Sequence, residues 1–157
     1  MDCRKFKITL LSANDLEDVR KLFKMKVYAR VSIGSNPETE KRTPPDKHGE
    51  VNPAWNFTLN YTINETMLHD YNNTLVIKLY CKRKLGDRYV GEVHASMKDL
   101  FDYSKQIGGS AVVTHPVLKG SVPSQGVLRF SYKFGEKVSI DKQLLIDNID
   151  DWSLFKG

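Results

Sequence analysis

The chain has 157 residues, of which 40% are hydrophobic and 27% charged, and a formal net charge of +5. These values are typical of one globular domain, and no apolar run approaches the roughly 18 residues of a membrane-spanning helix. The surplus of positive charge favours an acidic partner, such as anionic lipid, nucleic acid or an acidic protein. Two cysteines, Cys3 and Cys81, are too few and too far apart for a disulfide framework, which predicts a cytosolic compartment.

Alternation of apolar and polar residues predicts an all-β chain. The predicted strands span 5–12, 26–33, 40–43, 55–63, 74–81, 89–97, 111–118 and 126–134. Polar loops are predicted over 14–24, 46–53 and 82–87. One short helix is predicted over 97–103, with Ser96 as its N-cap. Eight strands and little helix predict an antiparallel β-sandwich of two sheets.

The residues after Lys137 differ in character from those before. Four aspartates between 141 and 151 alternate with Leu145, Ile149 and Trp152 at helical spacing. We therefore expect a sandwich domain over 1–137 and an acidic amphipathic tail over 138–157. The tail can be a strap that packs on its own domain, the interpretation we favour, or a segment that docks on a partner. Its acidity argues against insertion into an anionic membrane.

Six motifs follow one another in a fixed order along the chain. They are ITLLSANDL (8–16), KMKVYA (24–29), RTP (42–44), NPAWN (52–56), GEV (91–93) and GVLRFSYKFGEKV (126–138). In this order they resemble the small plant C2-domain proteins related to the soybean cold-regulated (SRC) proteins and to the copine-associated (BON-associated) regulators. The resemblance implies a C2 domain, a sandwich that docks on membranes, often through calcium. Because the chain opens on ITLLSANDL and closes on GVLRFSYKF, the resemblance also implies the type II strand topology.

The resemblance further indicates where the five calcium-binding aspartates of C2 domains fall. Those positions hold Arg20, Lys26, Cys81, Arg83 and Arg88. Asp87 can take the last position instead, because the third loop is short. Calcium needs several oxygen ligands, and cations at these positions repel it, so we expect neither a metal site nor a cofactor. The minority alternative is a weak calcium site built from Asp15, Glu17, Asp18, Asp46 and Asp87.

Cations fixed in the loops attract an anionic surface without the metal. We expect a lipid-binding site made of Arg20, Lys21, Lys24, Lys26, Lys82, Arg83, Lys84 and Arg88, with Leu22, Phe23 and Leu85 entering the headgroup region. Each Lys or Arg near an anionic leaflet contributes about 1 kcal/mol. Four engaged cations therefore contribute roughly 4 kcal/mol, or about a thousandfold in affinity. The alternative is that these charges are solvated and the apolar residues cap the core.

The remaining residues carry no recognisable chemistry. The four histidines show neither ligand nor triad spacing, and no phosphate-binding glycine loop or nucleophile elbow occurs, so we expect no enzymatic activity. Trp55 and Tyr28 are expected to fill the core, and Cys81 to be buried.

These patterns favour a non-enzymatic adaptor, cytoplasmic and peripheral at the inner face of the plasma membrane, that binds acidic phospholipid largely without calcium. The resemblance implies a signalling partner, copine-like, in cold-stress or defence signalling. The alternative is an interaction module whose basic loops bind an acidic partner protein, with residual calcium-dependent lipid binding as the lesser alternative. Nucleic acid is not expected, because no aromatic and basic stacking platform accompanies the charge.

Overall fold

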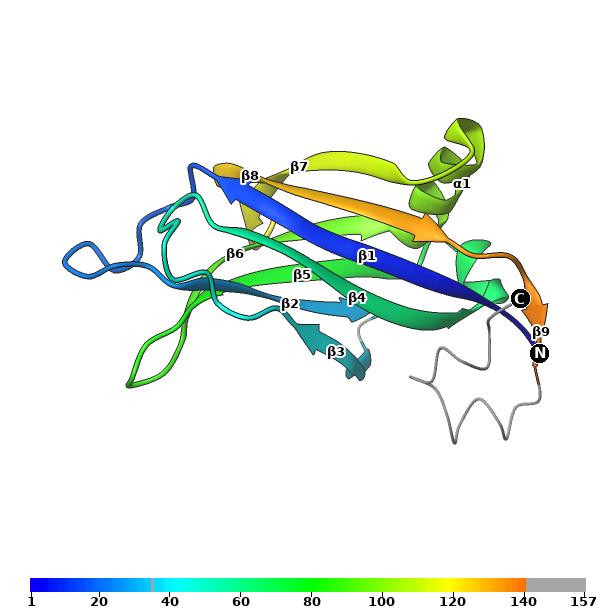
Figure 1. Cartoon of the computed structure of the whole chain (residues 1–157), viewed down its shortest axis with the longest axis horizontal. Helices are drawn as coiled ribbons and strands as arrows, with labels where there is room; N and C mark the ends of the chain where they lie inside the picture. The colour runs from blue at the N-terminus through cyan, green and yellow to red at the C-terminus, as the bar shows by residue number, and fades with distance from the viewer. Residues whose placement is uncertain (35, 141–157) are drawn as a thin grey trace.

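The computed structural model describes residues 1–34 and 36–140 of the chain. Within them lie nine strands, an α-helix and a short 3-10 helix (Figure 1). The strands are β1 (Asp2–Asn14), β2 (Val27–Ile33), β3 (Asn36–Arg42), β4 (Ala54–Asn64), β5 (Thr74–Cys81), β6 (Arg88–Ser96), β7 (Ala111–Lys119), β8 (Val122–Phe134) and β9 (Val138–Ser139). The helices are η1 (Glu65–Leu68) and α1 (Met97–Ile107).

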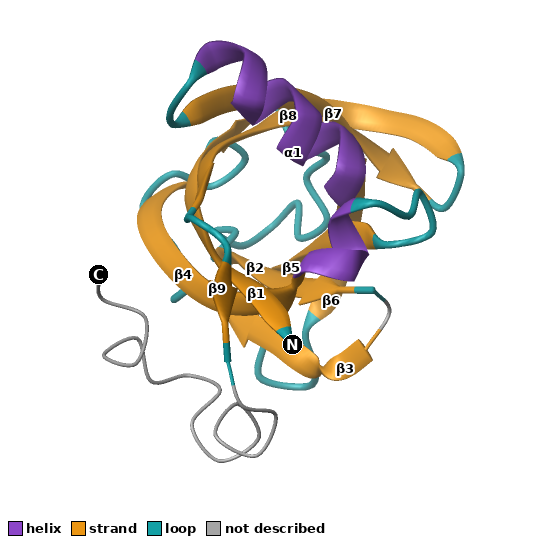
Figure 2. Cartoon of the chain, turned by 90° about the vertical axis from the view of Figure 1, so that its right-hand side faces the viewer, coloured by secondary structure: helices purple, strands orange, loops and turns teal. Residues whose placement is uncertain are grey.

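The strands form two antiparallel layers. They are hydrogen-bonded in the order β3-β2-β5-β6-β7-β8-β1-β4, with β9 beside β1. β6 and β7 meet through a single residue pair, Glu92 opposite Leu118, and the sheet folds over at this narrow junction. Seen from the end, the strands surround the interior (Figure 2). The predicted antiparallel β-sandwich is confirmed, with the opening strand β1 between β4 and the closing long strand β8.

The core lies between the two layers. Phe6, Ile8 and Leu10 of β1 are fully buried at alternate positions, as strand geometry requires. Helix α1 covers one end of the sandwich and buries Leu100 and Phe101 against it. Its N-cap is Ser96, as predicted, since the Ser96 hydroxyl accepts a hydrogen bond from the Asp99 amide at 3.3 Å. The helix extends beyond the predicted Tyr103 to Ile107, and its C-cap Gly108 takes the left-handed conformation favoured at helix C-termini.

Some predicted positions differ in the structure. Strand β3 begins at Asn36, because Asn36 already pairs with Ile33 of β2. Tyr28 is buried as expected but faces away from the core, since strand alternation directs Val27 and Ala29 inward. Phe57 is 37% exposed, where the alternation of β4 predicts a core position. The reason is local: Asn56 has a positive φ, and the pairing of β1 with β4 shifts register at this end.

The segment after Lys137 begins with a strand that the sequence did not predict. Val138 and Ser139 form β9 and pair with Cys3 and Asp2 of β1. The Ile140 amide also donates to the Met1 carbonyl at 2.8 Å. The rest of the predicted acidic tail, residues 141–157, lies outside the described residues.

Candidate functional site

Two loops project from the end of the sandwich that lies opposite α1 and the N-terminus (Figure 1). Loop 1 (residues 15–26) joins β1 to β2, and loop 3 (residues 82–87) joins β5 to β6. β2 and β5 are paired, with Val27 opposite Cys81 at the base of both loops. The Lys82 amide donates to the Lys26 carbonyl at 2.9 Å and extends this pairing into the loops. The two loops therefore start side by side.

Loop 1 is held by loop 2 (residues 43–53), which carries the start of the NPAWN motif. The Asn52 side-chain oxygen accepts a hydrogen bond from the Asp15 amide at 2.8 Å. The Leu16 amide donates to the Val51 carbonyl at 3.0 Å. Two residues beyond loop 2, the Trp55 indole N–H donates to the Val27 carbonyl at 2.8 Å, where loop 1 enters β2. The motif therefore holds both ends of loop 1.

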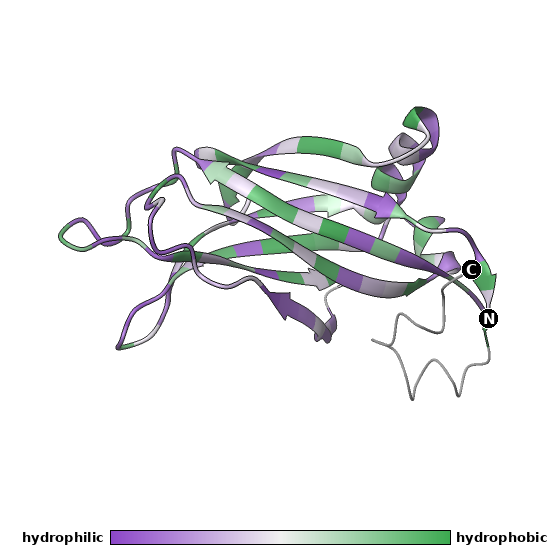
Figure 3. Ribbon diagram, in the orientation of Figure 1, coloured by the Kyte–Doolittle hydropathy of each residue, from purple (hydrophilic) through white to green (hydrophobic). Residues whose placement is uncertain are grey.

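The tip of loop 1 turns two apolar side chains outward. The Asp18 carboxylate accepts hydrogen bonds from the amides of Arg20 and Lys21, at 2.9 and 2.8 Å, and so closes a tight turn. The hydrogen bonds from these two amides lower the pKa of the Asp18 carboxyl, and the Lys21 amide has the larger effect. Beyond the turn, Leu22 is 89% and Phe23 67% exposed. The hydrophobic colour at this otherwise hydrophilic tip is visible in Figure 3.

Loop 3 is held by the carboxylate of Asp87. One Asp87 oxygen accepts the hydroxyl of Tyr28, and the other accepts the Arg83 amide at 3.1 Å. The Arg30 guanidinium in turn donates a hydrogen bond to the Tyr28 hydroxyl at 2.8 Å. The Tyr28 hydrogen bond, followed by that of the Arg83 amide, lowers the pKa of the Asp87 carboxyl. Leu85, at the loop tip, is 97% exposed.

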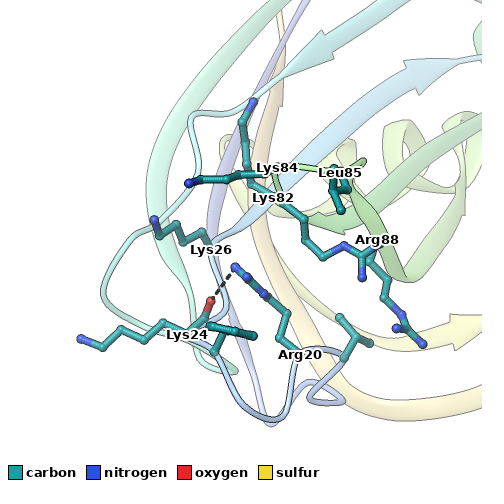
Figure 4. Close-up of a pocket in the computed structure, with 10 residues that line it drawn as sticks. Arg20, Lys24, Lys26, Lys82, Lys84, Leu85 and Arg88 are labelled. Atoms are coloured by element: carbon teal, nitrogen blue, oxygen red, sulfur yellow. Dashed lines mark hydrogen bonds between the residues drawn. The ribbon is translucent and has the colours of Figure 1, made fainter.

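Between loops 1 and 3 lies a pocket of about 910 Å³ (Figure 4). Its lining residues are Val19, Arg20, Phe23, Lys24, Lys26, Lys82, Arg83, Lys84, Leu85 and Arg88. The structure thus brings together most of the side chains assigned to lipid binding from the sequence. Lys21 and Leu22 are exposed beside the pocket but do not line it. Val19 also lines the pocket but was not predicted from the sequence, although it lies in the same loop as the predicted residues.

The pocket is lined by positive charge. Seven of its lining residues are Lys or Arg and none is acidic. Across residues 1–34 and 36–140, none of the seven forms an ion pair with a carboxylate. The Arg20 guanidinium donates to the Lys24 carbonyl at 3.3 Å and lies 5.0 Å from the Phe23 ring centre. In Figure 4 the ammonium groups of Lys24 and Lys26 extend away from this guanidinium.

The residues at this end do not fit a calcium ion. The expected ligand positions hold cations or, in Cys81, a fully buried thiol. Both oxygens of Asp46 accept backbone N–H groups of loop 2 and β4, and Glu17 pairs with Lys119 at 3.0 Å. Asp18 and Asp87 are engaged as described above. In the described part of the chain, no three or more His, Cys, Asp or Glu side chains are grouped as a metal site.

No helix among the described residues is both long enough and apolar enough to cross a bilayer. The prediction that Cys81 is buried is confirmed, since its exposure is 0%.

The fold and the loop arrangement are those of a C2 domain. The family model of the C2 domain matches residues 4–111, and the chain belongs to this family. It is 35% identical to Protein SRC2 of Glycine max over 140 residues, which cover 88% of this chain and 48% of the relative. It is 36% identical to the Protein SRC2 homolog of Arabidopsis thaliana, covering 87% of this chain and 42% of the relative. The chain therefore spans less than half the length of these relatives.

Solved structures give the same fold. A C2 domain of plant Extended Synaptotagmin 1 superimposes with a TM-score of 0.66, covering 86% of this chain and 96% of that one. Its sequence identity of 15% shows the fold alone. The predicted resemblance to small plant C2-domain proteins of the SRC type is confirmed. C2 domains are typically non-catalytic, and they commonly bind phospholipid membranes and proteins.

Proposed function

We propose that this C2 domain docks on anionic membranes through loops 1 and 3, largely without calcium. The observation that carries the proposal is the pocket between these loops, whose seven Lys and Arg side chains form no ion pair with a carboxylate in the described part of the chain. Unpaired cations on one surface attract an anionic surface, and calcium is not needed to supply the charge.

Apolar residues at the loop tips supply a second attraction. Leu22, Phe23 and Leu85 are largely exposed, in the same two loops as the cations. Apolar groups that enter the acyl boundary contribute about 0.8 kcal/mol per buried CH₂. With about 1 kcal/mol for each engaged cation, the two attractions together give reversible recruitment to a membrane.

The proposal extends to the cellular role. The domain is a non-enzymatic adaptor, peripheral at the cytoplasmic face of the plasma membrane, that brings a signalling protein there in plant cold-stress or defence responses. The similarity to the two plant SRC2 proteins is consistent with a stress protein. The partner binds outside loops 1 and 3, because the membrane covers them.

The experiment that tests membrane docking reverses charges in the pocket. Arg83→Glu combined with Arg88→Glu removes two attractions and adds two repulsions. Affinity for phosphatidylserine vesicles, measured by co-sedimentation in EGTA, is expected to fall by about thirtyfold or more. The matched control is Lys7→Glu with Lys133→Glu, an exposed cross-strand pair outside the pocket, which changes net charge equally. Equal losses in the two variants would show that only overall charge matters and would contradict the site.

The second candidate is an interaction module for an acidic protein. The same unpaired cations favour it, since a carboxylate-rich surface also complements them. Absence of binding to any anionic vesicle, with and without calcium, would favour this candidate over the membrane.

A further inference from the structure

A second hollow, of about 270 Å³, lies between α1 and the end of β8, at the end of the sandwich opposite loops 1 and 3 (Figure 1). Its apolar wall is formed by Phe101 and Phe134, whose rings meet edge to face with their centres 5.2 Å apart. Gly108 and Gly109 also line it, and a Cβ atom added at either glycine would meet no atom within 4 Å. The hollow is therefore open to solvent and can receive an apolar side chain.

The lining of the hollow favours an acidic ligand. It includes three cations and, among the described residues, no acidic side chain. Arg4 is neutralised by an ion pair with Glu65 at 2.6 Å. The Lys105 ammonium lies 3.9 Å from a carboxylate oxygen of Asp102, so this cation is only weakly paired.

Lys133, the third cation of the hollow, is in an unfavourable position without an anionic ligand. It forms no ion pair with a carboxylate in the described part of the chain. It also lies directly opposite Lys7 where β1 pairs with β8. Like charges directly opposite one another in a sheet are destabilising, so a carboxylate bound beside Lys133 relieves this repulsion.

The chain's own segment 141–157 carries the matching chemistry. It contains four aspartates against two lysines, and Asp150 and Asp151 come directly before Trp152. An aromatic side chain next to two carboxylates complements an apolar hollow that has cations at its rim.

Strand β9 brings this segment to the end of the molecule where the hollow lies. The Ile140 amide donates to the Met1 carbonyl, directly after β9 pairs with the start of β1. From Phe134, in the wall of the hollow, to Ile140 the chain spans at most about 22 Å. From Ile140 to Trp152 it spans about 18 Å as a helix and about 40 Å when extended. Trp152 therefore reaches the hollow without any change in β9, at an effective concentration on the order of millimolar.

We infer that the hollow between α1 and β8 binds the segment 141–157 of the same chain, with Trp152 as its anchor against the two phenylalanines. Asp150 and Asp151 pair with Lys105 and Lys133. The inference does not depend on membrane docking, because the hollow lies at the end of the sandwich opposite loops 1 and 3.

The test follows the exposure of Trp152 in the whole chain. Its fluorescence is the difference between the wild type and Trp152→Phe, which keeps only Trp55. We expect acrylamide to quench Trp152 at least threefold less in the whole chain than in the free peptide 141–157. Lys105→Glu with Lys133→Glu is expected to abolish this protection. Adding Asp150→Lys with Asp151→Lys to that variant is expected to restore it.

The control is Lys47→Glu with Lys78→Glu, which changes the net charge equally at two exposed lysines outside the hollow and is expected to keep the protection. Quenching in the wild type equal to that of the free peptide would overturn the inference. Protection that persists in Lys105→Glu with Lys133→Glu would also overturn it, because the segment would then bind elsewhere. Protection that grows with protein concentration would show binding to a second copy and would overturn docking within one chain.

Discussion

Asp87 shows how one acidic residue acquires a structural role at a site of positive charge. Its carboxylate joins the Tyr28 hydroxyl to the Arg83 amide and lies 4.0 Å from a guanidinium nitrogen of Arg30. Arg30 in turn lies over the Tyr80 ring, with 4.0 Å between the guanidinium carbon and the ring centre. Loop 3 is therefore fixed by a side chain where a calcium-binding C2 domain uses metal ligands.

Replacing Asp87 by Asn removes the charge and keeps the size of the side chain. Hydrogen bonds to charged groups contribute about 1.5–3 kcal/mol, and we expect the free energy of unfolding at pH 7 to fall by about 1–2 kcal/mol in urea denaturation. Glu136→Gln, at an exposed position, is the control and is expected to change little. Equal stability of Asp87→Asn and the wild type at pH 7 would contradict the role given to this carboxylate.

The effect of Asp87→Asn depends on pH in a defined direction. The folded-state pKa of Asp87 lies below its ordinary value of 3.8, chiefly because of the Tyr28 hydroxyl. The carboxylate therefore stabilises the fold above the unfolded-state pKa, and this contribution is lost as the pH falls through the lower folded-state pKa. The stabilities of wild type and variant are expected to converge below pH 3.8.

The sequence predicted the cations around Asp87 but not the use of Asp87 itself. The cations follow from loop positions that the C2 resemblance identifies. Tyr28 and Asp87 are 59 residues apart and meet only because β2 and β5 pair in one register. Strand alternation alone gave no partner for Tyr28, which was expected to lie in the core.

At the scale of elements, loop 1 depends on the NPAWN motif for its position. We expect Asn52→Ala to lower stability by about 1–2 kcal/mol, because it leaves the Asp15 amide without its acceptor. Vesicle affinity is expected to fall as well, because loop 1 loses the hydrogen bond that holds its first residue, Asp15. Asn72→Ala, in an exposed turn of the described chain, is the control for asparagine loss. Unchanged stability and affinity in Asn52→Ala would show that loop 1 keeps its position without the Asn52 side chain.

The apolar tips of the loops provide the complementary experiment. Leu22→Ala with Leu85→Ala changes two side chains that are 89% and 97% exposed, so stability is expected to change by less than about 0.5 kcal/mol. Vesicle affinity is expected to fall by about tenfold or more, because each inserted CH₂ contributes about 0.8 kcal/mol. Ile107→Ala, 46% exposed at the opposite end of the molecule, is the control in co-sedimentation. A fall in stability without loss of affinity would show that the two leucines cap the core instead.

Strands with strong alternation of apolar and polar residues could be predicted from the sequence. Strands that form mainly by pairing with a neighbouring strand could be predicted only in part or not at all. β2 and β5 follow the predicted spans closely, since each buries one face, while β1 extends beyond its predicted span of 5–12 at both ends. β3 was predicted only in part, over 40–43, because the pairing of Asn36 with Ile33 sets its start. β9 was not predicted, because it has two residues and forms by pairing with Asp2 and Cys3 at the start of β1.

In the whole molecule, the fold separates the helical end of the sandwich from the basic pocket. One end of the sandwich carries α1 and the chain's first residues, and the other presents the basic pocket (Figure 1). Motif order was enough to predict the C2 fold, because it specifies the strand order. The open pocket between the loops was not predictable, since it depends on how loop 2 and Asp87 direct loops 1 and 3.

The proposed membrane docking relies on the positive charge of the loops themselves and does not need calcium. Co-sedimentation of the wild-type chain with phosphatidylserine vesicles, in EGTA and in calcium, tests it most directly. Binding is expected in EGTA, and calcium is expected to change the affinity by less than about twofold. The affinity is expected to fall as added salt screens the loop cations. Binding that appears only when calcium is added would contradict it.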